Sequence, residues 1–417
     1  MQNTQTKEQG LNGLGDSFTL AGGQTIKNRF FKSAMSEQLG DKEHNPIPGL
    51  AMLYSRWAQG GIGLSMTGNI MIDRNALGEP KNVVLDEKSD LVQFKAWAKA
   101  GQENGSHLWV QLNHPGKQIP KFICEEPVAP SAIALEGGLE KGFNKPRELS
   151  EIEIEGIIKK FATSAELAKN AGFSGVQIHG AHGYLVSQFL SPRHNQRQDQ
   201  WGGSIENRMR FVLAVYHAIR RKVGNNFPIG IKLNSADFMK GGFTEEDSMQ
   251  VVKSLAQAGI DLIEVSGGTY ESPSMMGHKA KESTLKREAY FLDYIEKVRE
   301  LVDTPLVLTG GFRSAQGMQA ALDTGATDFI GIARTTAVDP DFPNKLLVDV
   351  NHKQELKVLT TGVRSLDKMA MLDITWYEQQ LARMAKGKAP KPNLSEVRTF
   401  IKVFMGAGFY AFKKRRA

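Results

Sequence analysis

Cysteine is almost absent from this sequence of 417 residues, in which Cys124 stands alone. A single cysteine excludes an intrachain disulfide, a CxxC zinc site and an iron–sulfur cluster held by cysteines of this chain. Proteins without disulfides are typical of reducing compartments, so we expect a cytoplasmic location.

Long hydrophobic runs are missing as well. No segment approaches the ~18 apolar residues that span a membrane. Residues 1–15 are polar and lack the apolar centre of a signal peptide. We therefore expect neither a membrane-spanning nor a secreted protein.

Positive charge is confined to one end of the chain. The formal net charge is +7, but residues 351–417 hold 14 Lys and Arg against 5 Asp and Glu, a net charge of +9 that leaves −2 for residues 1–350. A nearly neutral body does not indicate nucleic-acid binding. In the tail, the apolar and aromatic stretch 403–412 precedes the basic residues 413–416. We expect this stretch to pack on the rest of the protein or on a second subunit of a homo-oligomer; the weaker alternative is a peripheral contact with anionic lipid.

Short β-rich apolar runs alternate with longer amphipathic stretches, which predicts βαβ units and a parallel sheet. The runs lie at residues 30–34, 62–67, 107–112, 176–179, 229–233, 262–266, 306–309 and 329–332. Eight alternations favour an α/β fold with a single (β/α)8 TIM barrel. A doubly wound sheet is the alternative, but no GxGxxG follows the first strand.

Other local signals define the ends of helices and the limits of the barrel. Ser150 with Glu153 has the spacing of a capping box, and Ser204 and Thr244 are suitable helix N-caps. A hairpin before the first strand, with its turn at Gly22, is expected to cap the barrel. We assign residues 1–350 to the barrel and residues 351–417 to a basic helical extension with helices at 366–384 and 395–412.

Side chains that can carry chemistry follow the fourth predicted strand. His179, His182 and Tyr184 place two imidazoles and a phenol at one strand end, the end at which barrels carry their active sites. These groups could instead only tie down a loop. A zinc site is disfavoured, because the spacing is short of a helical pair and no third ligand stands nearby.

Glycines and arginines follow the seventh and eighth predicted strands, where barrels commonly bind phosphate. Gly310 and Gly311 end the seventh strand, and Ala333 with Arg334 ends the eighth. Ordinary barrel turns are the alternative, but the coincidence of two glycine-rich ends favours a phosphate site.

Two further polar residues lie in the third and fifth predicted strands. The amide of Gln111 can both donate and accept hydrogen bonds, as recognition of a pyrimidine edge requires. Lys232 is costly to bury unless an anion meets it. Together with the phosphate site and the donor group at the fourth strand, these residues indicate a phosphorylated flavin and a carbonyl substrate.

Several segments resemble the old yellow enzyme family. They are residues 28–36 (NRFFKSAMS), 111–116 (QLNHPG), 179–184 (HGAHGY), 189–197 (FLSPRHNQR), 201–208 (WGGSIENR), 310–311 and 331–334. They occur in order between residues 17 and 347, and the block after the fourth strand is highly specific. The resemblance implies non-covalent FMN, NADH or NADPH as the reductant, and a small electrophilic alkene, such as an α,β-unsaturated carbonyl compound, as the substrate.

The resemblance also implies roles for individual residues. The flavin edge is assigned to Ala34, Met35 and Ser36, its pyrimidine end to Thr67, Gln111 and Lys232, and its phosphate to Gly310, Gly311, Ala333 and Arg334. His179 and His182 would bind the substrate carbonyl oxygen, which stabilises the enolate-like transition state as hydride reaches Cβ. Tyr184 would donate the proton to Cα.

Some positions depart from the family pattern. Lys232 stands where most members have arginine, so a point charge replaces a planar fork. Gln38 and Asn113 stand where aromatic residues often line the pocket, which predicts a more open or more polar substrate pocket. The extension after residue 350 does not match the best-known members.

Three competing functions remain to be weighed. A relative with an iron–sulfur cluster and a further nucleotide-binding domain is disfavoured by the single cysteine. A metal-dependent barrel lyase would need carboxylate and histidine ligands at several strand ends, and none are found. A non-catalytic flavin-binding or stress protein stays open; a nicotinamide would reduce its flavin, but no alkene would reoxidise it.

Overall fold

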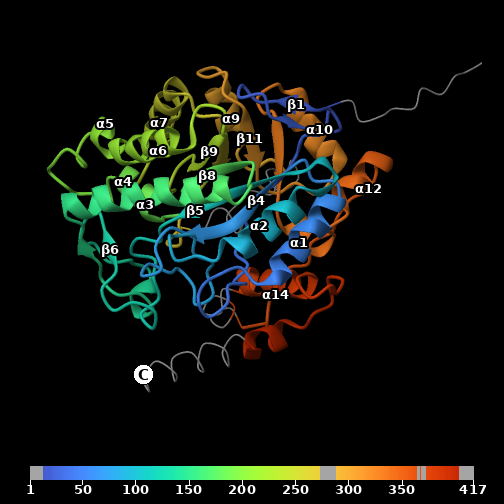
Figure 1. The fold of residues 1–417 in the computed structure, drawn as a ribbon, viewed down its shortest axis with the longest axis horizontal. Helices are drawn as coiled ribbons and strands as arrows, with labels where there is room; N and C mark the ends of the chain where they lie inside the picture. Colours follow the sequence, from blue (N-terminus) through green and yellow to red (C-terminus); the bar gives the residue numbers. More distant parts are fainter. Residues whose placement is uncertain (1–12, 273–287, 364–366, 368–371, 403–417) are drawn as a thin grey trace, which may run out of the picture.

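The computed structural model describes residues 13–272, 288–363, 367 and 372–402. Its centre is a closed barrel of parallel strands with helices outside it (Figure 1). The strands are β3 (Phe30–Lys32), β4 (Leu64–Met71), β5 (His107–Asn113), β8 (Gly175–Gly180), β9 (Ile229–Asn234), β10 (Leu262–Ser266), β11 (Leu306–Thr309) and β12 (Phe329–Ile332). Pairing of β12 with β3 closes the ring. The predicted (β/α)8 barrel is confirmed, and each strand overlaps its predicted segment.

The strands are buried along nearly their whole length because both faces are covered, by the barrel interior and by the helices. The long helices are α1 (Pro48–Gln59), α2 (Leu91–Gly101), α3 (Glu151–Asn170), α6 (Arg210–Val223), α7 (Glu245–Ala258), α9 (Leu292–Arg299), α10 (Ala315–Asp323) and α14 (Leu372–Met384). Shorter helices are α4 (Leu185–Leu190), α5 (Ile205–Arg208), α11 (Arg334–Val338) and α12 (Phe342–Val348).

The three predicted helix starts are confirmed. Ser150 and Glu153 form the capping box of α3, and the Thr244 hydroxyl accepts the backbone N–H of Asp247 at the start of α7. Ser204 precedes α5 but makes no side-chain capping bond. Ser204 is nevertheless the N-cap residue of α5, as predicted.

The hairpin of β1 (Phe18–Thr19) and β2 (Thr25–Ile26) closes the barrel where its strands begin. Leu20 and Ile26 pack in one cluster with Leu64, Leu262 and Phe329, which stand at the starts of three strands. The predicted capping hairpin is thus present, and the opposite end of the barrel is left for ligands.

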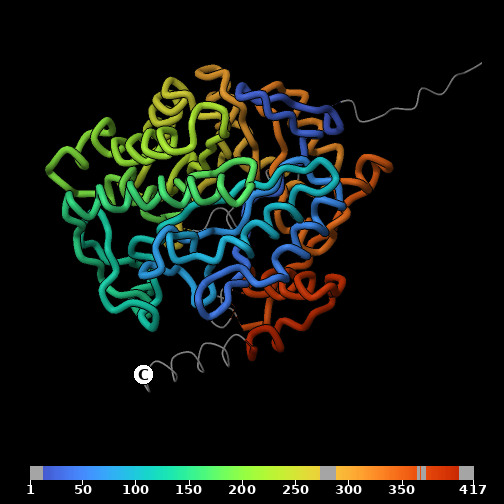
Figure 2. The backbone as a smooth tube through the Cα atoms, in the orientation of Figure 1, coloured from blue at the N-terminus to red at the C-terminus, as the bar shows by residue number. Residues whose placement is uncertain are grey.

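Two segments lie outside the strand–helix repeat. Residues 115–147 run out on one side of the barrel and carry the short parallel pair β6 (Val128–Ala129) and β7 (Arg147–Glu148) (Figure 2). At the other side, α14 contacts α1 and α11, and the Trp376 indole donates to the carbonyl oxygen of Leu394 at 3.0 Å. Of the two predicted extension helices, α14 covers most of the first; residues 403–412 of the second lie outside the described residues.

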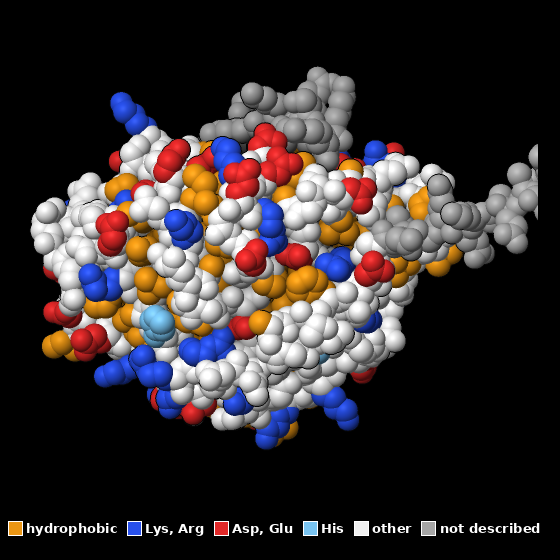
Figure 3. Space-filling model, turned by 90° about the horizontal axis from the view of Figure 1, so that it is seen from above, with side chains coloured by type: hydrophobic (Ala, Val, Ile, Leu, Met, Phe, Trp, Pro, Cys, Tyr) orange, Lys and Arg blue, Asp and Glu red, His pale blue; other side chains and the backbone are white. Residues whose placement is uncertain are grey.

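No helix among the described residues is long and apolar enough to cross a membrane. On the face drawn in Figure 3, Lys, Arg, Asp and Glu side chains are interspersed, and no large area carries charge of one sign.

Candidate active site

The C-terminal ends of the barrel strands bring together the residues predicted for catalysis. The His179 ring lies 5.2 Å from the ring of His182 and 4.8 Å from the ring of Tyr184, measured between centroids. All three come from the end of β8 and the turn after it, and His182 adopts a positive φ of 62° there. Such a conformation is strained for a histidine, so the turn holds the ring in place at a cost.

Both histidines are electrically neutral near pH 7. Burial, followed by the charges of His182 and Lys232, lowers the pKa of His179 well below its ordinary value. Burial and Lys232 lower the pKa of His182 to about 3. Nδ1 of His179 accepts the backbone N–H of Ala181 at 3.3 Å, so its proton is on Nε2 and can be donated to a ligand. Nε2 of His182 lies 2.8 Å from the Ser266 hydroxyl.

A second phenol lies beside Tyr184. The hydroxyl oxygens of Tyr184 and Tyr270 are 2.9 Å apart, and Tyr270 stands in the loop after β10. Burial raises the pKa of both phenols above their ordinary value. The phenols therefore keep their protons at physiological pH. Sequence analysis missed Tyr270, because nothing in its local sequence shows that the loop turns toward β8.

A buried polar chain crosses the barrel interior between β5, β8, β10 and β9. Gln111 Nε2 donates to Gln177 Oε1 at 2.7 Å, and Gln177 Nε2 donates to Glu264 Oε2 at 2.9 Å. Glu264 Oε1 in turn pairs with Lys232 Nζ at 3.0 Å. Glu264 is therefore an anion that meets the buried lysine, which sequence analysis required but did not identify.

A second buried lysine lies on β3. Lys32 Nζ donates to the carbonyl oxygen of Met66 at 2.8 Å and to the Tyr54 hydroxyl at 3.1 Å. The Tyr54 hydroxyl also contacts the carboxylate of Glu37. Burial, opposed by Glu37, lowers the pKa of Lys32 to about 8. The positive charge of Lys232 also lowers the pKa of Lys32. The two lysines therefore place two cationic groups close together inside the barrel.

A β-bulge lies at Thr67, the residue predicted to contact the pyrimidine end of the flavin. The pairing of β4 with β5 shifts register between Met66 and Asn69, so Thr67 leaves the regular ladder. Its hydroxyl donates to the carbonyl oxygen of Gly68 at 2.7 Å and accepts the backbone N–H of Gln111 at 2.9 Å. Bulges often redirect a strand next to an active site.

The ends of β11 and β12 enclose a pocket of about 90 Å³. It is lined by Thr309, Gly310, Gly311, Phe312, Gly331, Ile332, Ala333, Arg334, Thr335 and Leu356. Gly311 has a φ of +92°, and a Cβ there would lie 2.2 Å from the Glu288 carbonyl oxygen. A Cβ on Gly331 would lie 2.7 Å from the Thr309 side chain. Glycines therefore leave room for backbone and ligand at this place, and Arg334 adds a positive charge that suits a phosphate.

The C-terminal extension reaches the site at two points. Glu378 of α14 accepts a hydrogen bond from Gln38 Nε2 at 2.9 Å, and the charge of Arg334 acts on Tyr377, the residue next to Glu378.

Glu378 lies close to a second buried carboxyl group, that of Glu79, to which Ser36 donates a hydrogen bond at 2.5 Å. Burial and then the charge of Glu79 raise the pKa of Glu378 well above its ordinary value. No sequence signal connected Glu79 or Glu378 with the site, since only the fold brings these distant segments together.

The remaining predicted residues take less distinctive positions. Ala34 and Met35 are partly buried after β3, each against an apolar cluster. Asn113 is fully buried at the end of β5; its Nδ2 lies 3.9 Å from the sulfur of Met71, and its Oδ1 has no hydrogen-bond partner among the described residues. Its assignment to the substrate pocket stays a prediction.

The fold and the donor set together define a class of protein. Among the described residues, no group of His, Cys, Asp and Glu could hold a metal ion. A monophosphate suits the glycine-lined pocket, and the amide of Gln111 in β5 and the amine of Lys232 in β9 offer donors and an acceptor that a pyrimidine edge requires. These features define a barrel oxidoreductase that uses flavin mononucleotide.

The chain belongs to the NADH:flavin oxidoreductase / NADH oxidase family, whose family model matches residues 18–353. It is 38% identical over 359 residues to the NADH-dependent flavin oxidoreductase iliE of Hypocrea jecorina, which covers 80% of this chain and 88% of that protein. It is 33% identical over 408 residues to the NADH-dependent flavin oxidoreductase iccE of Talaromyces variabilis, with 89% and 98% coverage. The cofactor is therefore FMN and the reductant NADH. Against some bacterial relatives, such as the NADH oxidase of Thermoanaerobacter brockii, the match spans 49% of the longer protein.

Solved structures agree with this assignment. The old yellow enzyme homologue of Zymomonas mobilis superposes with a TM-score of 0.70 at 25% identity, covering 82% of this chain and 95% of that one. Morphinone reductase in complex with tetrahydroNAD superposes with a TM-score of 0.67 at 26% identity, covering 82% and 92%.

Proposed function

We propose that this protein is an ene-reductase that reduces the C=C bond of α,β-unsaturated carbonyl compounds with hydride from NADH. The observation that carries the proposal is the convergence of two neutral imidazoles and a protonated phenol at the end of β8. Two N–H donors suit a carbonyl oxygen, and an adjacent O–H suits a carbon that gains negative charge.

The chain's own residues would divide the work as follows. Hydride transfer is the chemistry that bound FMN supplies. The Nε2 proton of His179 and a ring proton of His182 would polarise the substrate carbonyl, and Tyr184 would deliver its phenolic proton to Cα. Ala34, Met35, Ser36, Thr67, Gln111 and Lys232 would orient the isoalloxazine ring, and Gly310, Gly311, Ala333 and Arg334 would hold its phosphate.

The charge of the surrounding side chains favours neutral substrates. The carboxyl groups of Glu79 and Glu378 both act electrostatically on Tyr184 and Tyr270. Burial raises the pKa of both carboxyl groups, which shows that negative charge is unfavourable at this place. The charge of a carboxylate substrate would meet the same unfavourable surroundings, so we infer a preference for uncharged enones.

Turnover with a defined set of alkenes tests the proposal. The protein would be reduced anaerobically with NADH and mixed with a cyclic enone or with the matching unsaturated carboxylate. We expect rapid flavin reoxidation by the enone and a much slower reaction with the carboxylate. A flavin that NADH reduces but no enone reoxidises would support a non-catalytic flavin-binding protein instead.

The histidine donors can be tested through ligand binding. His179→Ala and His182→Ala should each weaken the binding of phenol about 2- to 10-fold, since a hydrogen bond between neutral groups contributes ~0.5–1.5 kcal/mol. Because the pKa values of both histidines are lowered, they gain protons only as the pH falls far below 6.5. The affinity for phenol should therefore stay constant between about pH 6 and 8, because phenol itself ionises only near pH ~10. Unchanged affinity in both variants would contradict the carbonyl-binding role.

A further inference from the structure

We propose that Tyr270 is a positioning residue for the protonation step, in which its hydroxyl donates a hydrogen bond to the Tyr184 oxygen as Tyr184 gives up its proton. The inference rests on the proposed function. It concerns a residue that no sequence motif identified and that lies 86 positions from Tyr184 along the chain.

The proposed proton transfer determines the direction of this hydrogen bond. The two oxygens are 2.9 Å apart, and either could be the donor. If Tyr184 directs its proton toward Cα of the substrate, its oxygen can only accept from Tyr270. The rings meet edge to face at a centroid distance of 5.8 Å, which keeps the second phenol in reach.

Tyr184 needs such a partner because its surroundings oppose a negative charge. Burial raises its pKa well above the ordinary value, and the neighbouring Tyr270, followed by the carboxyl groups of Glu79 and Glu378, raises it further in the resting protein. The shared hydrogen bond therefore has to run from Tyr270 to Tyr184 as Tyr184 gives up its proton. A phenol with so high a pKa is a weak acid. A hydrogen bond to the phenolate oxygen is strongest when the charge forms, so it stabilises the transition state more than the ground state.

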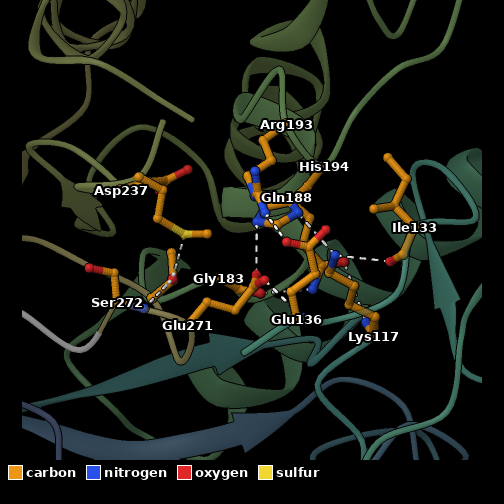
Figure 4. Close-up of polar contacts among 12 residues, drawn as sticks. Lys117, Ile133, Glu136, Gly183, Gln188, Arg193, His194, Asp237, Glu271 and Ser272 are labelled. Carbon is orange, nitrogen blue, oxygen red and sulfur yellow. Dashed lines mark hydrogen bonds and ion pairs between the residues drawn. The ribbon is translucent and has the colours of Figure 1, made fainter. Parts of the chain in front are cut away.

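The loop that carries Tyr270 is anchored through the next residue, Glu271 (Figure 4). Glu271 Oε1 accepts the backbone N–H of Glu136 at 3.0 Å, and Oε2 lies 3.3 Å from Nε2 of His194. The side chains of Glu271 and His194 are 4% and 3% exposed. Lys117 Nζ contacts Nδ1 of His194 at 2.9 Å and donates to the Ile133 carbonyl oxygen at 3.0 Å.

This buried chain links three segments that are far apart in sequence. Burial and the nearby cations Lys117 and Arg193 lower the pKa of His194 to about 3, so the ring is neutral. With Lys117 donating to Nδ1, the His194 proton is on Nε2, and this nitrogen lies 3.3 Å from Glu271 Oε2. Contacts of Glu271 thus connect the Tyr270 loop to residues 115–147 and to the segment after β8 that holds His194. These contacts keep the Tyr270 hydroxyl close to the Tyr184 hydroxyl.

The step balances without any added reactant. The O–H bond of Tyr184 breaks as the Cα–H bond forms. The new bond takes its electron pair from the enolate of the substrate, and the electron pair of the O–H bond stays on the Tyr184 oxygen. Tyr270 keeps its own proton and shares it with that oxygen. A proton from solvent water then restores Tyr184.

Single-turnover measurements on the holoenzyme test the proposal. In Tyr270→Phe, flavin reduction by NADH should be unchanged, and reoxidation by an enone should slow about 10- to 100-fold, the loss expected for a hydrogen bond to a developing charge. The solvent isotope effect on reoxidation should rise, because proton transfer limits the rate more strongly. Glu271→Ala, which frees the loop, should slow the same step.

A double-mutant cycle separates this role from a structural one. In the Tyr184→Phe background, Tyr270→Phe should have no further effect on reoxidation, because the hydroxyl that it serves is gone. A Tyr270→Phe enzyme with the wild-type rate, or one that is slowed equally in both backgrounds, would overturn the inference. A wild-type protein that no enone reoxidises would overturn the proposed function itself.

Discussion

Replacing Tyr184 by phenylalanine should leave flavin reduction by NADH nearly intact and slow reoxidation by an enone about 10²- to 10⁴-fold, the range of general acid catalysis. The variant removes one hydroxyl from a ring that is nearly fully buried beside His179, so the fold should tolerate it. Anaerobic stopped-flow absorbance measures the two half-reactions separately. Because the pKa of Tyr184 is raised, the wild-type alkene step should not decline between about pH 7 and 9, where an ordinary phenol with a pKa near 10 would begin to ionise.

The matched control for this variant is Tyr294→Phe. Tyr294 is also buried, and its hydroxyl lies 2.6 Å from the Ser248 hydroxyl on the outer layer of helices. The Tyr294→Phe variant should leave the rates of both half-reactions unchanged. If Tyr184→Phe slowed NADH oxidation and enone reduction alike, Tyr184 would have a structural role and another group would be the proton donor.

Replacing Lys232 by methionine should cause the largest loss of stability. Lys232 and Glu264 form an ion pair at 3.0 Å, with side chains 5% and 0% exposed. Removing one partner of a buried pair leaves an uncompensated charge and typically costs ~3–5 kcal/mol. Denaturant unfolding of the apoprotein would measure this change in the free energy of unfolding. In the holoprotein we also expect a lower flavin reduction potential, because a cation near the pyrimidine end is lost.

Two variants identify the cause of that loss. Lys232→Met combined with Glu264→Gln removes both charges and keeps a carbonyl oxygen for the Gln177 amide, so it should regain most of the stability but not the reduction potential. Lys222→Met breaks an exposed pair with Glu166 at 2.9 Å, and such pairs contribute only ~0–1 kcal/mol. A single Lys232 variant as stable as Lys222→Met would show that Glu264 does not depend on Lys232.

The C-terminal extension has a closer relation to the site than its sequence indicated. Leu356 lines the glycine-lined pocket at the ends of β11 and β12, and Glu378 of α14 contacts Gln38. We propose that the extension folds with the barrel as one unit rather than as a separate appendage. The boundary at residue 350, the oligomeric state and the alternative of a lipid contact by the tail stay predictions.

The barrel could be predicted from the sequence because its determinants are local. Each strand is a short apolar run, and the glycines, caps and polar motifs stand next to those runs, so the order of elements and the strand-end residues His179, Tyr184, Gly311 and Arg334 could be found without coordinates. The family resemblance rests on the same strand-end segments. It therefore assigned the cofactor and the reaction class from residues that are close together in the chain.

Only the tertiary structure decided which side chains complete the site. Glu264 meets Lys232 because β10 pairs with β9 in one particular register, and a shift of one residue would turn Glu264 to the other face of the strand. Tyr270 and Glu378 reach the strand ends on a loop and on a helix whose paths depend on long-range packing, and no local periodicity encodes such contacts. The sequence by itself therefore determined the barrel and the end of it that binds ligands. The charges around that end were decided by closure of the barrel, because only closure brings side chains that are distant in sequence into the same low-dielectric space.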